Sequence, residues 1–154
     1  MPATRKDLPV SELLITEVLQ KVSNAKTKQE KIALLHKFNT NALRTILIWN
    51  FDESVKSAIP EGEVPYTAND APAGTEHSRL IHEYRNLYRF VIGGDKGLNR
   101  LRRETLFIQL LEGLHADEAE LICLVKDKNL QSKYRVTKAV VEEAFPKIKW
   151  GNRG

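Results

Sequence analysis

Hydrophobic residues recur along this chain at steps of three and four, the period of α-helices that each bury one face. Capping residues and breakers divide this pattern into separate helices. In the first of them, Leu14, Val18 and Val22 share one face, and Ser11 is the expected N-cap. The expected helices cover residues 11–24, 27–38, 41–50, 75–91, 99–113, 116–126 and 137–145, with a possible helical turn at 52–58. The pattern therefore predicts an all-α fold.

Local signals fix several of these boundaries. Thr27 and Glu30 form a capping-box pattern, in which the hydroxyl and the carboxylate can each accept a hydrogen bond from a backbone N–H. Gly113 is expected to cap the C-terminal end of helix 99–113. Leu101 and Leu111 are predicted to lie in the core side of that helix. Pro146 cannot continue a helix, so the last helix is expected to stop at Phe145.

Residues 59–75 interrupt the helical pattern. The stretch holds three prolines and two glycines and has no helical period, so it is predicted to be a long loop. Tyr66 is the residue expected to anchor it on the core. The expected organisation is a flexible arm over residues 1–10, one helical domain over 11–150 and a tail over 151–154. We expect a single compact bundle of about six to seven helices.

Composition adds little to the fold but constrains the partner. Hydrophobic residues make up 42% and charged residues 29%, and the net charge of +4 favours an anionic partner. The single cysteine, Cys123, lies among apolar residues and is expected to be a buried thiol. We find no apolar run long enough for a membrane span and no signal-peptide pattern. We therefore expect an intracellular, cytoplasmic protein without a membrane partner.

The positive charge is concentrated in residues 79–103, which hold seven basic and two acidic residues. Within this stretch, Gly93 and Gly94 are expected to form a turn between two helices. A glycine turn that leads into a helix N-terminus, with basic side chains around it, can hold phosphate oxygens. The same residues also fit an ordinary helix C-cap with solvent-facing arginines. The local pattern leaves both interpretations open.

The chain lacks the side-chain patterns of an enzyme. Its histidines are His36, His77, His82 and His115, which are too scattered for a metal site. Glu142 and Glu143 are adjacent on a helix and therefore point about 100° apart, which disfavours a catalytic carboxylate pair. We predict no catalytic residue, no metal and no cofactor. A pocket lined by His82, Tyr84 and Arg85 would be needed to support the opposite hypothesis.

Four stretches of the chain occur in a recognisable order. They are Thr27-Lys28-Gln29 continuing to Leu34-Leu35, then Asn41 to Ile46, then Arg89 to Gly93, and finally Asp117 to Pro146. In this order the chain resembles the N-terminal helical DNA-binding domain of ATP-dependent DNA ligases, particularly the compact ligases of large tailed phages. The resemblance covers about residues 11–149.

The resemblance implies a helical module that holds the minor groove and the sugar-phosphate backbone of duplex DNA largely without reading sequence. Arg89 and Gly93 match the family's backbone-contacting turn, and Thr137 matches a capping hydroxyl that points toward a phosphate. The Lys-x-Asp-Gly motif of the adenylation domain is absent, so ligation is not expected. Glu142 and Glu143 replace residues that are usually polar or basic in the family. The resemblance also implies a phage-encoded protein that acts in an infected host cell.

We therefore predict a non-catalytic module that binds double-stranded DNA through its backbone. The predicted DNA-binding residues are Arg85, Arg89, Gly93, Lys96, Arg100, Arg103, Lys133, Arg135, Thr137 and Lys138. The alternative is an adaptor that binds a replication or transcription protein, such as a polymerase, a clamp or a host factor. The acidic loop and the Glu142-Glu143 pair favour this alternative.

Overall fold

A computed structural model describes residues 13–70 and 78–151 of the chain. The predicted arm 1–10, the Ser11 cap, residues 71–75 of the loop and the last three residues of the tail lie outside this part. Within the described residues the elements are α1 (Ile15–Asn24), α2 (Lys28–Lys37), α3 (Asn41–Phe51), α4 (Leu80–Glu83), η2 (Tyr84–Phe90), α5 (Arg100–Gly113), α6 (Ala116–Lys126), η3 (Leu130–Ser132) and α7 (Lys138–Ala144). The all-α prediction is confirmed, and in this part of the chain only two isolated bridges have strand-like pairing.

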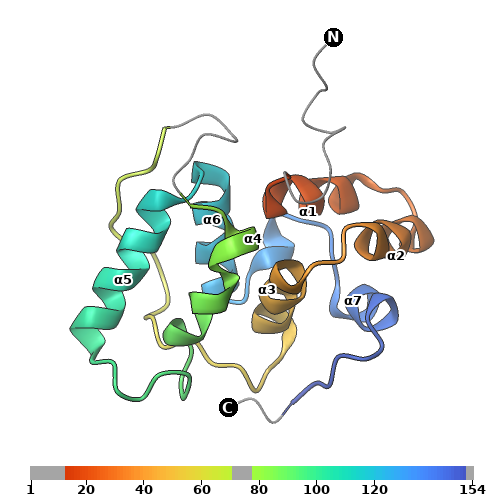
Figure 1. Cartoon of the computed structure of the whole chain (residues 1–154). Helices are drawn as coiled ribbons and strands as arrows, with labels where there is room; N and C mark the ends of the chain where they lie inside the picture. Colours follow the sequence, from red (N-terminus) through yellow and green to blue (C-terminus); the bar gives the residue numbers. More distant parts are fainter. Residues whose placement is uncertain (1–12, 71–77, 152–154) are drawn as a thin grey trace.

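Helix α6 forms the centre of the fold. It packs against α1, α3, α5 and η3, while α2 packs against α1 and α7. In Figure 1, α5 lies at one side of the molecule and α2 and α7 lie at the other, with α3 and α4 between them. The residues Ala119, Leu121, Ile122 and Val125 of α6 are fully buried. This agrees with the nearly continuous apolar run that the sequence has there.

One buried carboxylate joins three helices. Glu118 lies in the first turn of α6 and is fully buried. Its carboxylate accepts hydrogen bonds from the backbone N–H of Ile15 (2.9 Å) and of Leu80 (3.1 Å), at the starts of α1 and α4. Helix N-termini expose N–H groups without intrahelical partners, so an anion between them is stabilising. Glu118 therefore fixes the two helix starts relative to α6.

Polar side chains cap the other helices much as their types predict. The hydroxyl of Thr27 accepts a hydrogen bond from Glu30 N at 3.1 Å, while the Glu30 carboxylate accepts one from Lys26 N rather than from Thr27 N. Thr40 and Asn99 cap α3 and α5 in the same manner. These bonds satisfy backbone donors that a helix start leaves unpaired.

Two predicted elements have a different conformation. Residues 52–58 do not form a helical turn; they are held against η2 by hydrogen bonds from Ala58 N to Phe90 O and from Ile92 N to Lys56 O, each 2.7 Å long. The predicted helix 75–91 consists, in its described part, of the short α4 and the tighter 3-10 helix η2. The tighter winding buries Phe90, whose ring packs edge-on against Phe107 with centroids 5.0 Å apart. Val91, at the end of the predicted helix, is half-buried and pairs with Ser57.

Helix α5 also differs from its prediction. Leu101 was expected in the core but is 75% exposed, because the buried stripe of α5 is Phe107 and Leu111. Gly113 is the last helical residue and not the cap, which is Leu114. A side chain at Gly113 would approach the Ser78 hydroxyl to 3.0 Å, and Ser78 N donates to the Gly113 carbonyl. The glycine therefore allows close contact with the chain before α4.

The described part of the loop, residues 59–70, contains no helix and packs along α5 and α6. Tyr66 is half-buried against the core, as predicted, and burial raises the pKa of its phenol. Lys126 reaches this loop from the end of α6, where its ammonium donates to the Pro60 and Gly62 carbonyls at 2.8 and 3.0 Å. Lys126 is buried, so these hydrogen bonds satisfy its charge inside the fold.

Candidate nucleic-acid interface

The glycine turn between η2 and α5 needs both of its glycines, for different reasons. Gly93 has a φ of +86°, in the left-handed region that favours glycine. A Cβ on Gly94 would lie 1.9 Å from the Tyr88 carbonyl oxygen, so any side chain there would displace the backbone. The chain therefore reverses within a space that only these residues allow.

Arg103 holds this turn in place from inside. Its guanidinium donates hydrogen bonds to the carbonyls of Arg89 (2.8 Å), Asp95 (2.9 Å) and Leu98 (3.0 Å). Arg103 is one helical turn before Phe107 on the inward side of α5, and its side chain is half-buried. Sequence reasoning assigned Arg103 to DNA, whereas the structure places it under the turn as a clamp of three backbone carbonyls.

The start of α5 carries cations where helices usually carry acids. Its first turn has no acidic residue and contains Arg100 and Arg102 beside the Asn99 cap. The N-terminus of a helix has a partial positive charge, so basic side chains are repelled there unless an anion is bound. Arg100 is 81% exposed and forms an ion pair with Glu104 at 3.3 Å, while Arg102 is exposed and lacks an acidic partner among the described residues.

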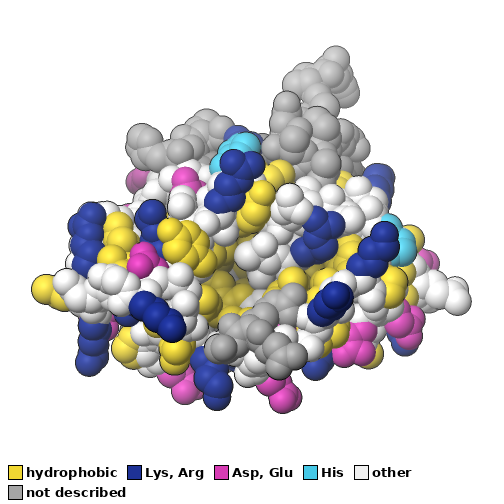
Figure 2. All heavy atoms as spheres, turned by 60° about the horizontal axis from the view of Figure 1, so that its bottom comes forward, with side chains coloured by type: hydrophobic (Ala, Val, Ile, Leu, Met, Phe, Trp, Pro, Cys, Tyr) yellow, Lys and Arg dark blue, Asp and Glu magenta, His cyan; other side chains and the backbone are white. Residues whose placement is uncertain are grey.

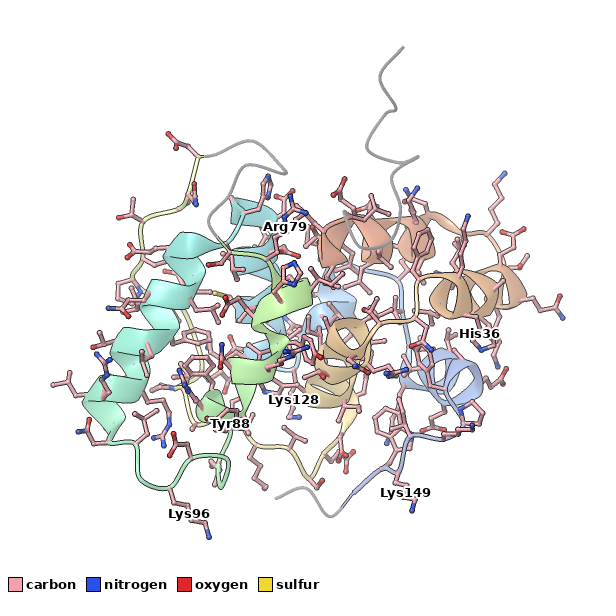
Figure 3. The ribbon with its side chains drawn as sticks, in the orientation of Figure 1. His36, Arg79, Tyr88, Lys96, Lys128 and Lys149 are labelled. Atoms are coloured by element: carbon pink, nitrogen blue, oxygen red, sulfur yellow. The ribbon has the colours of Figure 1, made fainter. Side chains whose placement is uncertain are left out.

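Apolar side chains are exposed in the same stretch. Among the described residues the exposed large hydrophobic side chains are Tyr88 (46%), Ile92 (55%) and Leu101 (75%), and all lie in residues 84–103, which we call the turn segment. Lys96 extends away from the molecule at the far end of the glycine turn (Figure 3). Exposed apolar groups interleaved with cations are typical of a binding surface rather than of a solvated helix face.

Two tyrosine–arginine pairs occupy η2. The Arg85 guanidinium carbon lies 5.7 Å from the Tyr84 ring centroid, and that of Arg89 lies 5.8 Å from the Tyr88 ring centroid. Hydrogen bonds donated to the Tyr84 phenol oxygen by Arg85 and by Asn41 lower the pKa of this phenol. In the described part of the chain, no acidic side chain lies within ion-pair distance of Arg85, Arg89 or Lys96.

The predicted residues after α6 have a different environment. They are Lys133, Arg135, Thr137 and Lys138, and we call residues 133–144 the closing segment. Lys133 forms an ion pair with Glu120 at 2.6 Å, and Lys138 lies 3.9 Å from Glu142. The Thr137 hydroxyl accepts a hydrogen bond from Val140 N at 3.3 Å and so caps α7. Arg135 is exposed without a described acidic partner, while its backbone is held by Ser23 and Lys31.

The predicted site residues therefore separate into two groups on different elements. Lys and Arg side chains are spaced around the face shown in Figure 2 and do not form one block, and hydrophobic side chains line a hollow in the middle of that face. Sequence reasoning missed Arg102 and Tyr88 as candidate contacts. Arg102 could have been found from the lack of acids in the first turn of its helix.

The side chains that could hold a metal ion or act as a nucleophile are scattered in the described residues. These residues contain no group of three or more His, Cys, Asp or Glu side chains that could hold a metal ion. Cys123 is half-buried, and burial raises the pKa of its thiol to about 11, which keeps it protonated. Tyr84 and Arg85 line a hollow next to α3, and His82 is not among its lining residues. None of the helices described here has the length and hydrophobicity needed to cross a membrane.

Comparison with protein families gives one match. The model of a family of unknown function (DUF6433) matches residues 18–132, about three quarters of the chain. The chain belongs to this family. The match includes the turn segment and ends before Lys133. Comparisons with curated proteins and with solved structures found no match.

Proposed function

We propose that this member of the DUF6433 family is a non-catalytic DNA-binding module that holds the sugar-phosphate backbone with its turn segment. One observation carries the proposal. In the turn segment, cations that have no acidic partner among the described residues lie beside exposed large apolar side chains. Arg85, Arg89, Lys96 and Arg102 are the cations that would face phosphates. The resemblance to the ligase DNA-binding domain supports the same mode of binding.

Helix geometry supports the placement of a phosphate near α5. The exposed start of a helix attracts an anion through its N–H groups, and Arg102 and Lys96 add charge beside it. Minor-groove proteins insert apolar side chains such as isoleucine and leucine between base steps. Ile92 lies beside the glycine turn, is 55% exposed and is available for such a contact.

A salt titration of duplex binding tests this proposal. About four neutralised phosphates predict a slope of log affinity against log salt near −3.6. The double variant Arg89→Gln with Lys96→Gln should make the negative slope shallower by about two and should strongly lower the affinity for duplex DNA. Fluorescence anisotropy with a labelled duplex measures both quantities.

The matched control removes the same charge from the closing segment. Lys133→Gln with Lys138→Gln also lowers the net charge by two, but each lysine already has a described acidic partner. This control should leave the slope nearly unchanged. Equal losses in the two double variants, or no duplex binding by the unaltered protein at low salt, would sink the proposal.

A second candidate function is the adaptor. A hollow of about 200 Å³ between α5 and the loop is lined by Glu61, Glu63 and Glu104 together with apolar residues such as Phe107 and Ile108. An acidic, partly apolar hollow fits a basic peptide of a partner protein. Binding of a basic peptide that is lost in Glu61→Gln with Glu63→Gln, but kept in the arginine–lysine variant, would favour this function over DNA binding.

A further inference from the structure

A second feature of the turn segment is a hollow between α3 and η2 with a volume of about 260 Å³. Trp49 and Leu87, both almost fully buried, are among its deep residues, and Tyr88 is exposed at its rim. The walls are mostly hydrocarbon, and Tyr84 and Arg85 also line it. The hollow is therefore apolar inside and aromatic and basic at its edge.

Arg85 is the charged residue among those that line the hollow. None of the residues that line it is acidic. The Tyr84 phenol oxygen accepts hydrogen bonds from Arg85 Nε at 3.4 Å and from Asn41 Nδ2 at 3.5 Å. Arg44 donates to the side-chain oxygen of Asn39 at 2.7 Å and to that of Asn41. A network of arginine, asparagine and tyrosine side chains thus borders the hollow on the side of α3.

These groups match the chemistry of an unpaired nucleotide. Aromatic rings stack on bases, arginines bind the adjacent phosphates, and an apolar cavity excludes water from the base. A peptide side chain would also fit an apolar hollow, but Arg85 at its edge, Arg44 nearby and the lack of an acidic lining residue favour an anionic chain over a neutral or basic one. The hollow has room for one base ring system.

Resting on the proposed DNA-binding function, we infer that the hollow between α3 and η2 holds one unstacked base of a single-stranded stretch of DNA. Tyr88 contacts the base at the rim, and Arg85 and Arg89 hold its flanking phosphates. The protein therefore prefers duplexes that carry a single-stranded end or gap over fully paired duplexes.

Three labelled DNA molecules test this inference by anisotropy. They are a blunt duplex, the same duplex with a short single-stranded overhang, and a duplex with an overhang of equal length made of abasic sugars. The last two have the same backbone charge, so their difference reports the bases alone. Stacking of one base predicts roughly five- to hundredfold tighter binding of the natural overhang than of the abasic one.

Variants at the rim of the hollow test whether the preference for the natural overhang arises there. Tyr88→Ala should reduce the preference for the natural overhang to about twofold or less, and Tyr88→Phe should retain it, because the ring and not the hydroxyl makes the contact. Leu101→Ala is the matched control, because Leu101 is also an exposed apolar residue of the turn segment but does not line the hollow. It should keep the preference.

A direct signal is available from Trp49. In a Trp150→Phe background the remaining tryptophan lines the hollow, so the natural overhang should quench its fluorescence and the abasic overhang should not. Equal affinity for the two overhangs with intact duplex binding overturns this inference and leaves the proposed function standing. A loss of preference in Leu101→Ala but not in Tyr88→Ala also overturns it. Absence of binding to all three molecules overturns both proposals.

Discussion

The turn segment and the closing segment have similar basic composition, yet their cations have different environments. In the closing segment two of the three cations, Lys133 and Lys138, lie near Glu120 and Glu142, and Arg135 is the exception. Thr137 uses its hydroxyl as a helix cap. In the turn segment Arg89 and Lys96 have no acidic partner in the described chain, and apolar side chains are exposed around them. The number of cations in a stretch therefore does not tell how many are available to an anionic partner. That depends on which acidic residues the fold brings close.

The largest expected loss of stability comes from adding a side chain at the glycine turn. Gly94→Ala places a methyl group against the Tyr88 carbonyl, so we expect destabilisation of about 1–3 kcal/mol or more, together with weaker DNA binding. Gly97→Ala is the control in the same turn, since its Cβ would meet nothing nearer than the Asp95 carboxylate at 3.7 Å. That control should change stability by less than about 0.5 kcal/mol. Urea denaturation followed by circular dichroism compares the two, and equal midpoints would contradict the steric argument.

The next largest effect compares the stability contributed by Arg103, which clamps the turn, with that contributed by Lys133 in a surface ion pair. Arg103→Met keeps most of the apolar stem and removes three hydrogen bonds to backbone carbonyls. Bonds from charged donors are stronger than neutral ones, and after allowance for partial exposure we expect a loss of about 2 kcal/mol. Lys133→Met breaks an exposed ion pair and should cost less than about 0.5 kcal/mol.

The same two variants also compare the effects of Arg103 and Lys133 on DNA affinity. Arg103→Met should weaken DNA binding through loss of order in the turn, and Arg103→Lys should restore part of both stability and binding. Lys133→Met should leave binding nearly unchanged. If Arg103→Met kept full stability but lost binding, Arg103 would be a direct phosphate contact, as the sequence suggested, and its role as a clamp would be wrong.

The sequence was informative where local chemistry decides the structure. The predicted bounds of α3, α5 and α7 lie within one or two residues of the observed ones. Their starts are capped by Thr40, Asn99 and Thr137, and Pro146 follows the last helix, so signals within three or four residues set these bounds. The apolar period of α1 and α6 likewise identified buried faces. The basic glycine turn itself was identified by the same local reasoning.

Contacts between distant residues explain what the sequence could not predict. The 3-10 winding of η2 accompanies the packing of Phe90 on Phe107 and the pairing of residues 90–92 with 56–58. The inward position of Arg103 depends on the same packing of α5, and the partner of Lys133 is thirteen residues away on α6. The hollow between α3 and η2 joins residues about forty positions apart. None of these contacts has a signature within one helix or one turn.

A smaller effect tests the role that the ligase resemblance assigns to Thr137. Thr137→Ala removes the cap of α7 and should destabilise the protein by about 1 kcal/mol without changing DNA affinity. Thr137→Ser should restore stability, because serine supplies the same hydroxyl acceptor. Thermal denaturation and anisotropy measure the two quantities. A loss of affinity without a loss of stability would instead place the hydroxyl on a phosphate, and the closing segment would then share the function of the turn segment.

The smallest effect compares one tyrosine from each segment. Hydrogen bonds from Arg85 and Asn41 lower the pKa of the Tyr84 phenol below its usual value of 10, whereas burial raises the pKa of Tyr134 to about 12. Tyr134 therefore contributes stability that is complete below pH 10 and is lost as the pH rises through about 12. In a titration followed by phenolate absorbance, Tyr84→Phe should remove the first phenol to ionise, and Tyr134→Phe should remove one of the last. If Tyr84→Phe left the early part of the curve unchanged, the arginine–asparagine network that borders the hollow would not exist in solution, and the basic border assigned to the turn segment would lose part of its support.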